Sequence, residues 1–125
     1  MKKTETYSNI HLNYKVWLSD EGGESLLGDD KWQLLKAVER LGSLKAAADS
    51  LKISYRKAWG DIQTAEVKLG FQLLGKIRGG KEGGNSFLTD EGKRFIQAYD
   101  EFHREFSDSV EHVIVKFKRT LKRKL

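Results

Sequence analysis

The sequence has no cysteine and no proline among its 125 residues, and only three histidines. Without cysteine, disulfides, thiolate metal sites and cysteine nucleophiles are excluded. No apolar run approaches the ~18 residues of a membrane span, and the basic start at Lys2 and Lys3 is not followed by an apolar signal segment. We therefore expect a cytoplasmic protein.

The composition is that of a globular chain: 38% of residues are hydrophobic and 33% are charged. A chain of this length builds one core but not two, and no linker long enough to separate two parts interrupts it. The sequence predicts a single domain over residues 1–125.

The net charge of +5 is unevenly distributed. Six cations near the C-terminus exceed it, so the rest of the chain is close to neutral: Lys116, Lys118, Arg119, Lys122, Arg123 and Lys124. Such a cluster suits the negative end of a helix dipole, and it also suits a polyanionic partner. Both interpretations stay open, and the overall charge does not decide between them.

The first half of the chain alternates and then turns helical. Apolar residues at every second position from Ile10 to Leu18 predict a half-buried strand. After a loop, Asp29 and Asp30 begin a helix with an apolar face, and Gly42 ends it.

Two further helices follow. Ser43 is a natural N-cap for a short helix with apolar residues at i, i+3, i+4 and i+7. Lys52 and Ile53 make a tight turn, and Ser54 caps a third helix that extends to about Gly70.

Residues 71–77 and 86–88 predict two strands around a glycine-rich loop, which is a hairpin. Thr89 then caps a last helix, which no proline interrupts. Its apolar residues are spaced 4-3-4-4-3-4: Phe95, Tyr99, Phe102, Phe106, Val110, Val113 and Phe117.

This order predicts a mainly α fold with a small β-hairpin wing, a winged helix-turn-helix. The helix-turn-helix covers about residues 43–70, the wing about 72–89, and a long C-terminal dimerisation helix about 90–122. Because the seam of that helix has near-heptad spacing, it needs a partner helix. We expect a homodimer formed through Phe102, Phe106, Val110, Val113 and Phe117.

The third helix carries the strongest functional signal. Its inward face holds Ala58, Trp59, Ile62, Ala65 and Leu69; its outward face holds Arg56, Lys57, Gly60, Gln63 and Thr64. Two cations in the first turn oppose the helix dipole, and a mid-helix glycine costs about 1 kcal/mol relative to alanine. Such side chains reach base edges and phosphates in a major groove. We therefore expect a nucleic-acid partner, although an ordinary solvated basic face is the simpler alternative.

The hairpin loop adds cations and four glycines, which leave its backbone free to follow a phosphate surface. Gly75 to Lys81 also matches the first part of a phosphate-binding loop. However, Glu82 stands where that motif needs serine or threonine, and a strand follows instead of a helix. The sequence offers no catalytic set, so we predict no enzyme and no metal site.

The segments Gly42–Ala48 and Ile53–Trp59 resemble the N-terminal DNA-binding domain of ModE-type bacterial regulators, which respond to molybdate, and more distantly the LysR-type winged helices. The similarity continues through Glu66–Gly70, Gly79–Gly84 and Leu88–Gly92. In that family the third helix enters the DNA groove, the wing touches the backbone and the long helix dimerises. The resemblance implies these roles for Ser54, Tyr55, Arg56 and Lys57, and for Gly79 to Gly84.

We expect a dimeric, sequence-specific bacterial transcriptional regulator that binds double-stranded DNA. Full-length ModE continues into molybdate-binding domains that this chain lacks, so we expect no cofactor and no small-molecule ligand. Two alternatives are a regulator that senses an oxyanion through a partner and a protein-interaction module without DNA. The expected DNA-binding residues are Ser43, Ser54, Tyr55, Arg56, Lys57, Gly60, Gln63, Thr64, Arg78, Gly79, Gly80 and Lys81.

Overall fold

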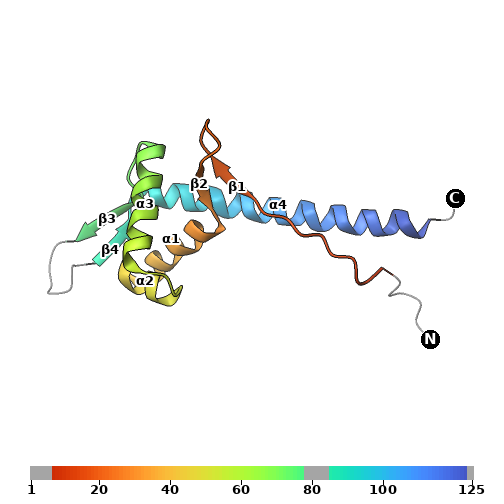
Figure 1. Cartoon of the computed structure of the whole chain (residues 1–125), viewed down its shortest axis with the longest axis horizontal. Helices are drawn as coiled ribbons and strands as arrows, with labels where there is room; N and C mark the ends of the chain where they lie inside the picture. The colour runs from red at the N-terminus through yellow and green to blue at the C-terminus, as the bar shows by residue number, and fades with distance from the viewer. Residues whose placement is uncertain (1–6, 78–84, 124–125) are drawn as a thin grey trace. The chain divides into compact units, whose positions relative to one another are not determined.

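The computed structural model describes residues 7–77 and 85–123. Helices and two antiparallel strand pairs alternate along this part of the chain (Figure 1). In order, the elements are β1 (Trp17–Ser19), β2 (Ser25–Gly28), α1 (Asp29–Leu41), α2 (Leu44–Ser50), α3 (Tyr55–Leu69), β3 (Leu74–Ile77), β4 (Asn85–Leu88) and α4 (Asp90–Lys122).

The chain falls into two compact units, one of residues 16–99 and one that joins the residues up to Lys15 with those from Asp100 onward. In the first unit α1, α2 and α3 pack around one core. Its largest fully buried side chains are Leu27, Leu34, Leu35, Val38, Leu44, Ile62 and Leu73. Burying each such side chain stabilises the fold by roughly 1.5–3 kcal/mol.

The helix boundaries follow the capping signals in the sequence. Gly42 and Gly70 end α1 and α3 at φ 83°, a left-handed conformation that glycine adopts without steric cost. Thr89 caps α4 through the N–H of Gly92, which donates to its hydroxyl over 2.9 Å. The predicted starts and ends of the helices are confirmed.

The predicted strand over residues 10–18 is wrong for most of its length. Only Trp17–Ser19 forms a strand, and its partner β2, which the sequence analysis missed, is itself only four residues long. A strand cannot extend beyond the partner that supplies its hydrogen bonds. Leu12 and Tyr14 are 43% and 50% exposed, so the alternation there does not mark a half-buried strand.

The first strand of the hairpin is also shorter than predicted, Leu74–Ile77 instead of residues 71–77. The side chain of Glu66 explains the late start, because its Oε2 accepts the N–H groups of Leu73 and Leu74 over 2.7 and 3.1 Å. Ladder pairing begins at Leu74, opposite Leu88.

Tyr99 fixes the first part of α4 within the unit of residues 16–99. Its hydroxyl donates to Asp29 Oδ1 over 2.9 Å, and its ring lies 5.3 Å from that of Trp32. Burial of the phenol, reinforced by the Asp29 carboxylate, raises the pKa of Tyr99 to about 12. The start of α4 is thus held by a nearly buried, hydrogen-bonded side chain.

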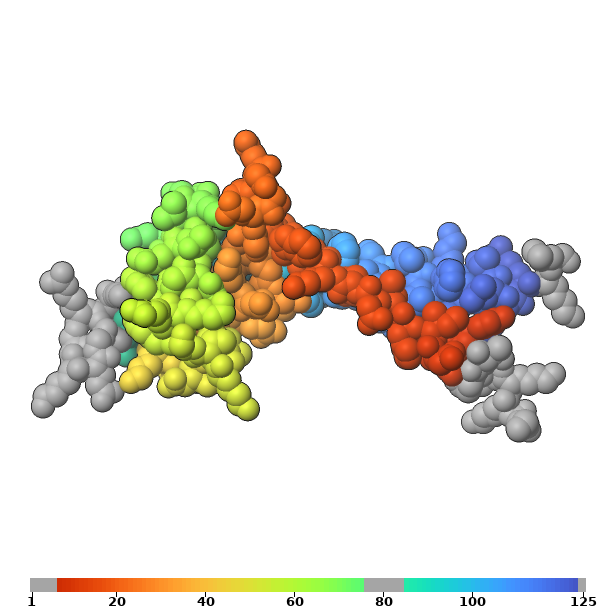
Figure 2. All heavy atoms as spheres, viewed as in Figure 1, coloured from red at the N-terminus to blue at the C-terminus, as the bar shows by residue number. Residues whose placement is uncertain are grey.

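In the second unit, residues 7–15 lie along the C-terminal part of α4 (Figure 2). The rings of Tyr14 and Phe106 are 5.5 Å apart, and the Tyr14 hydroxyl lies 3.5 Å from Ser107 Oγ. The extended segment therefore finds its packing partner on a helix. No helix among residues 7–77 and 85–123 is both long and apolar enough to cross a membrane.

Candidate nucleic-acid interface

The turn between α2 and α3 is held by side-chain caps at both helix starts. Ser43 Oγ accepts the N–H of Ala46, and Ser54 Oγ accepts the N–H of Lys57, each over 3.0 Å. Lys52 takes φ 60° between the two helices, which makes the turn tight. Ser43 and Ser54 therefore have structural roles, whatever else they contact.

The inward face of α3 is only partly as predicted. Ala58, Ile62 and Ala65 are completely buried. Trp59 and Leu69, however, are only half-buried. The helical period placed Trp59 on the correct side of α3, but it did not show that the other core residues cover only part of the indole.

The predicted outward face of α3 is confirmed as a surface: each of its members is exposed. The Lys57 ammonium pairs with Asp61 Oδ2 over 3.1 Å along the helix. Among the described residues the Arg56 guanidinium has no ion pair, and it stands in the first turn with Tyr55, which is 47% exposed. Arg56 is thus the cation on this face that the fold leaves unneutralised.

Gly60 lies at the middle of this face, and a Cβ built there meets no atom within 4 Å. Neither backbone conformation nor packing inside the protein calls for glycine at this position. Val67, which the sequence analysis did not select, continues the same face and is 82% exposed. Extending the 100° periodicity by one more turn would have found it.

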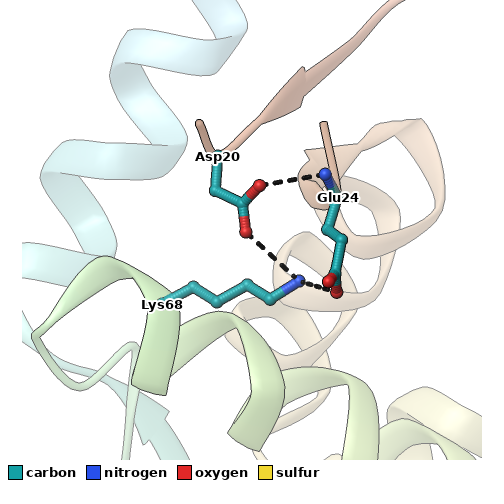
Figure 3. Close-up of polar contacts among 3 residues, drawn as sticks. All are labelled: Asp20, Glu24 and Lys68. Atoms are coloured by element: carbon teal, nitrogen blue, oxygen red, sulfur yellow. Dashed lines mark hydrogen bonds and ion pairs between the residues drawn. The ribbon is translucent and has the colours of Figure 1, made fainter. Parts of the chain in front are cut away.

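The C-terminal end of α3 is tied to the turn between β1 and β2 (Figure 3). The Lys68 ammonium lies 2.8 Å from Glu24 Oε2 and 3.7 Å from Asp20 Oδ2. The hydrogen bond to Glu24 is the main cause that raises the pKa of Lys68. No spacing in the sequence indicates this cluster, because it joins residues more than forty positions apart.

The hairpin of β3 and β4 stands next to α3 as the predicted wing does, but its tip lies outside the described residues. The predicted contacts at Arg78, Gly79, Gly80 and Lys81 are therefore not described. At the base of the hairpin, Gly75 pairs with Phe87, and a Cβ on Gly75 would collide with the Phe87 ring. Glycine at this position lets an aromatic ring cover the strand.

The predicted dimerisation residues lie along the C-terminal part of α4. Phe106, Val113 and Phe117 are 37%, 57% and 50% exposed, whereas Phe102 and Val110 are half-buried. Leu121, which was not predicted, adds a further exposed apolar side chain. Most of this stripe is thus uncovered within one chain.

Residues 30–93, half of the chain, match the family model described as a bacterial regulatory helix-turn-helix protein of the lysR family. The chain belongs to this family. The match covers α1 to the start of α4 and so contains the helix-turn-helix and the hairpin.

Several curated relatives carry the name ModE. The chain is 33% identical over 87 residues to the molybdenum transport protein ModE of Azotobacter vinelandii, covering 70% of this chain and 32% of that protein. It is 31% identical over 104 residues to the transcriptional regulator ModE of Haemophilus influenzae, covering 83% and 37%. The chain thus spans about a third of the length of these relatives. The expected resemblance is confirmed, and these relatives are not named as enzymes.

Among solved structures, the chain resembles the DNA-binding domain of CbnR in a complex with DNA, with a TM-score of 0.59 and 22% identity over 72% of this chain and 98% of that one. It also resembles ArgP from Mycobacterium tuberculosis, with a TM-score of 0.53 and 22% identity over 71% of this chain and 31% of that one. These likenesses concern the fold, and they confirm the predicted winged helix-turn-helix.

Proposed function

We propose that this chain is a dimeric, sequence-specific regulator that binds double-stranded DNA, with α3 in the major groove and the glycine-rich hairpin on the backbone. The observation that carries the proposal is the outward face of α3. It combines an unpaired Arg56, a Lys57 in the dipole-disfavoured first turn and a Gly60 that no contact inside the protein requires. A helix optimised for stability alone would have none of these features.

The test is selection of binding sequences from random double-stranded DNA with the purified chain, followed by titration of one selected and one scrambled duplex. We expect tighter binding of the selected duplex and a steep loss of affinity between 50 and 200 mM salt. About 6–10 phosphate contacts by a dimer correspond to a ~10³–10⁵-fold loss over this range. The absence of any enriched sequence, with no shift at low salt, would refute the proposal and favour a protein-interaction module.

The dimer in this proposal pairs the C-terminal parts of two α4 helices. An exposed apolar stripe on a helix is covered best by another helix with the same stripe. Charges along this part of α4 are segregated: Asp100, Glu101, Glu105, Asp108 and Glu111 precede Lys116, Lys118, Arg119 and Lys122, with only Arg104 out of place, and Arg123 follows directly after the helix. Antiparallel pairing sets each acidic block beside a basic one, whereas parallel pairing opposes like charges.

The antiparallel arrangement brings Phe106 of one copy beside Phe117 of the other. Because the chain has no cysteine of its own, Phe106→Cys and Phe117→Cys chains report on this directly. We expect light scattering to give twice the 14.3 kDa mass of one chain. We also expect disulfides to form on mixing the two variants but not within either one alone. A monomer at tens of micromolar, or cross-linking of each variant with itself, would contradict the proposed dimer.

Regulation by an oxyanion has no direct support in this chain. The names of two relatives mention molybdenum transport or a ModE regulator, but the chain covers only about a third of each. We propose that the described part works as the DNA-binding portion without a small ligand of its own. Titration calorimetry with molybdate and tungstate is expected to show no heat at micromolar concentration.

A further inference from the structure

A hollow of about 320 Å³ opens between α3 and the base of the hairpin. Figure 1 shows these elements together in the unit of residues 16–99. The side chains that matter for its chemistry come from both: Trp59, Gln63 and Glu66 from α3, and Gln72, Leu74 and Ser86 from the hairpin and the segment before it. The sequence places Gln72 and Ser86 within the predicted wing but indicates no individual role for either residue.

The two walls of this hollow are fixed to each other by Glu66. Its Oε2 accepts both the Leu73 and the Leu74 N–H, which joins the last turns of α3 to the beginning of β3. Hydrogen bonds to a carboxylate are the stronger kind. A site whose walls are already set loses little conformational entropy when it is filled.

The lining has an apolar floor and a neutral polar rim. Trp59 and Leu74 supply the apolar part, while Gln63, Gln72 and Ser86 offer amide and hydroxyl groups. The side chains of these three polar residues make no hydrogen bond to other described residues. No cation occurs among the described lining residues, and the Glu66 carboxylate already accepts the Leu73 and Leu74 N–H groups. The described lining therefore offers an apolar surface beside neutral hydrogen-bond donors, which suits an apolar ligand body that carries hydrogen-bond acceptor oxygens.

We propose that this hollow receives one deoxyribose–phosphate unit of the DNA strand that passes between α3 and the hairpin. The sugar lies on Trp59 and Leu74, and Gln72 and Ser86 donate to a phosphate oxygen. This inference rests on the proposed DNA binding, in which α3 and the hairpin flank the same strand. Gln72 and Ser86 thereby act as neutral contacts that set the position of the duplex without selecting its sequence.

Neutral contacts can be distinguished from cationic ones by their salt dependence. Gln72→Ala and Ser86→Ala are expected to weaken binding about three- to tenfold, equally for the selected and the scrambled duplex, with an unchanged salt slope. Lys57→Ala, in contrast, should lower that slope by about one phosphate equivalent. Gln72→Glu should lose more affinity than Gln72→Ala, because it places a negative charge against the phosphate. Gln97→Ala, at an exposed glutamine of α4, serves as the control and should leave affinity unchanged.

A second measurement locates the contact on the DNA. A single uncharged methylphosphonate is moved along the strand in a series of duplexes. At one position this replacement should lower the affinity of the wild-type protein but cause no further loss of affinity for the Gln72→Ala variant. If no duplex binds at all, the proposed function itself fails. If DNA binds but these variants have wild-type affinity, or if their losses of affinity differ between sequences, the proposed contact between the hollow and the DNA backbone is wrong and the proposed function stands. Thermal melts of each variant show that the fold is retained.

Discussion

Replacing Gly60 with alanine separates the needs of the fold from the needs of the function. The residue lies in the middle of α3, exposed, with no atom within 4 Å of a Cβ placed there. Alanine loses less conformational entropy in a helix than glycine does, by about 0.5–1 kcal/mol. The variant should therefore be more stable than wild type. For a unit the size of residues 16–99, this corresponds to roughly 2–8 °C in Tm.

The same methyl group should weaken DNA binding. A carbon atom needs about 3.5–4.0 Å from its nearest heavy neighbours, so a backbone that approaches the groove at Gly60 is pushed away. The expected loss is about 1–3 kcal/mol, the range for one good base contact, or roughly 5- to 150-fold in Kd. Thermal melts monitored by circular dichroism and titration of the selected duplex measure both effects on the same preparation.

Gly92→Ala is the matched control, because its Cβ would collide with the backbone carbonyl oxygen of Leu73. Glycine-to-alanine substitution should therefore lower the Tm of the protein at Gly92 and raise it at Gly60. A Gly60→Ala variant that melts below wild type would show that the helix itself requires the glycine. A variant that is stabilised but binds DNA as tightly as wild type would show that the middle of α3 does not approach DNA.

Three further outcomes are expected. Arg56→Ala should leave Tm unchanged or raise it slightly, because the substitution removes a cation from the positive end of the helix dipole. It should lower DNA affinity by about 1–3 kcal/mol, and by different amounts for different duplexes. An equal loss on every duplex would show that Arg56 contacts a phosphate instead of a base. Trp59→Ala should cost less than the ~3–5 kcal/mol of a fully buried tryptophan, because Trp59 is only half-buried. Urea titration measures this loss. The pKa of Tyr99 is about 12 in the folded state and 10.0 in the unfolded state. The protonated phenol therefore stabilises the fold fully below pH 10, and about 2–3 kcal/mol of the free energy of unfolding is lost as the pH rises towards 12. In urea titrations at pH 9 to 12, Tyr99→Phe should lose less stability with rising pH than wild type does.

The sequence predicted the helices well because capping interactions between neighbouring residues set the helix ends. Ser43, Ser54 and Thr89 accept the backbone N–H groups that begin three of the helices. Gly42 and Gly70 end two of them in a conformation that other residues avoid. Such signals act within four residues, so a single sequence contains the whole interaction. The same locality explains why the outward face of α3 could be derived from period alone.

The failures concern interactions between distant segments. Period-two alternation from Ile10 to Leu18 indicated a strand, but pairing depends on β2, whose four residues reach only Trp17–Ser19. Similarly, the start of β3 is set by the Glu66 carboxylate, eight positions before Leu74. Local pattern gives the tendency of a segment, while the available hydrogen-bond partners decide its length.

The two parts of the proposed DNA-binding surface, the outward face of α3 and the hollow beside it, were predictable to different extents. Arg56 and Gly60 violate the local rules of a stable helix, and that violation is visible in the sequence itself. The hollow beside them is not, because Gln72 and Ser86 violate no rule and gain their meaning only from the hairpin that brings them to α3. In the proposed complex, the residues that would select a DNA sequence are thus recognisable by what they cost the fold. The proposed neutral contacts cost the fold nothing, so only a structure brings them to notice.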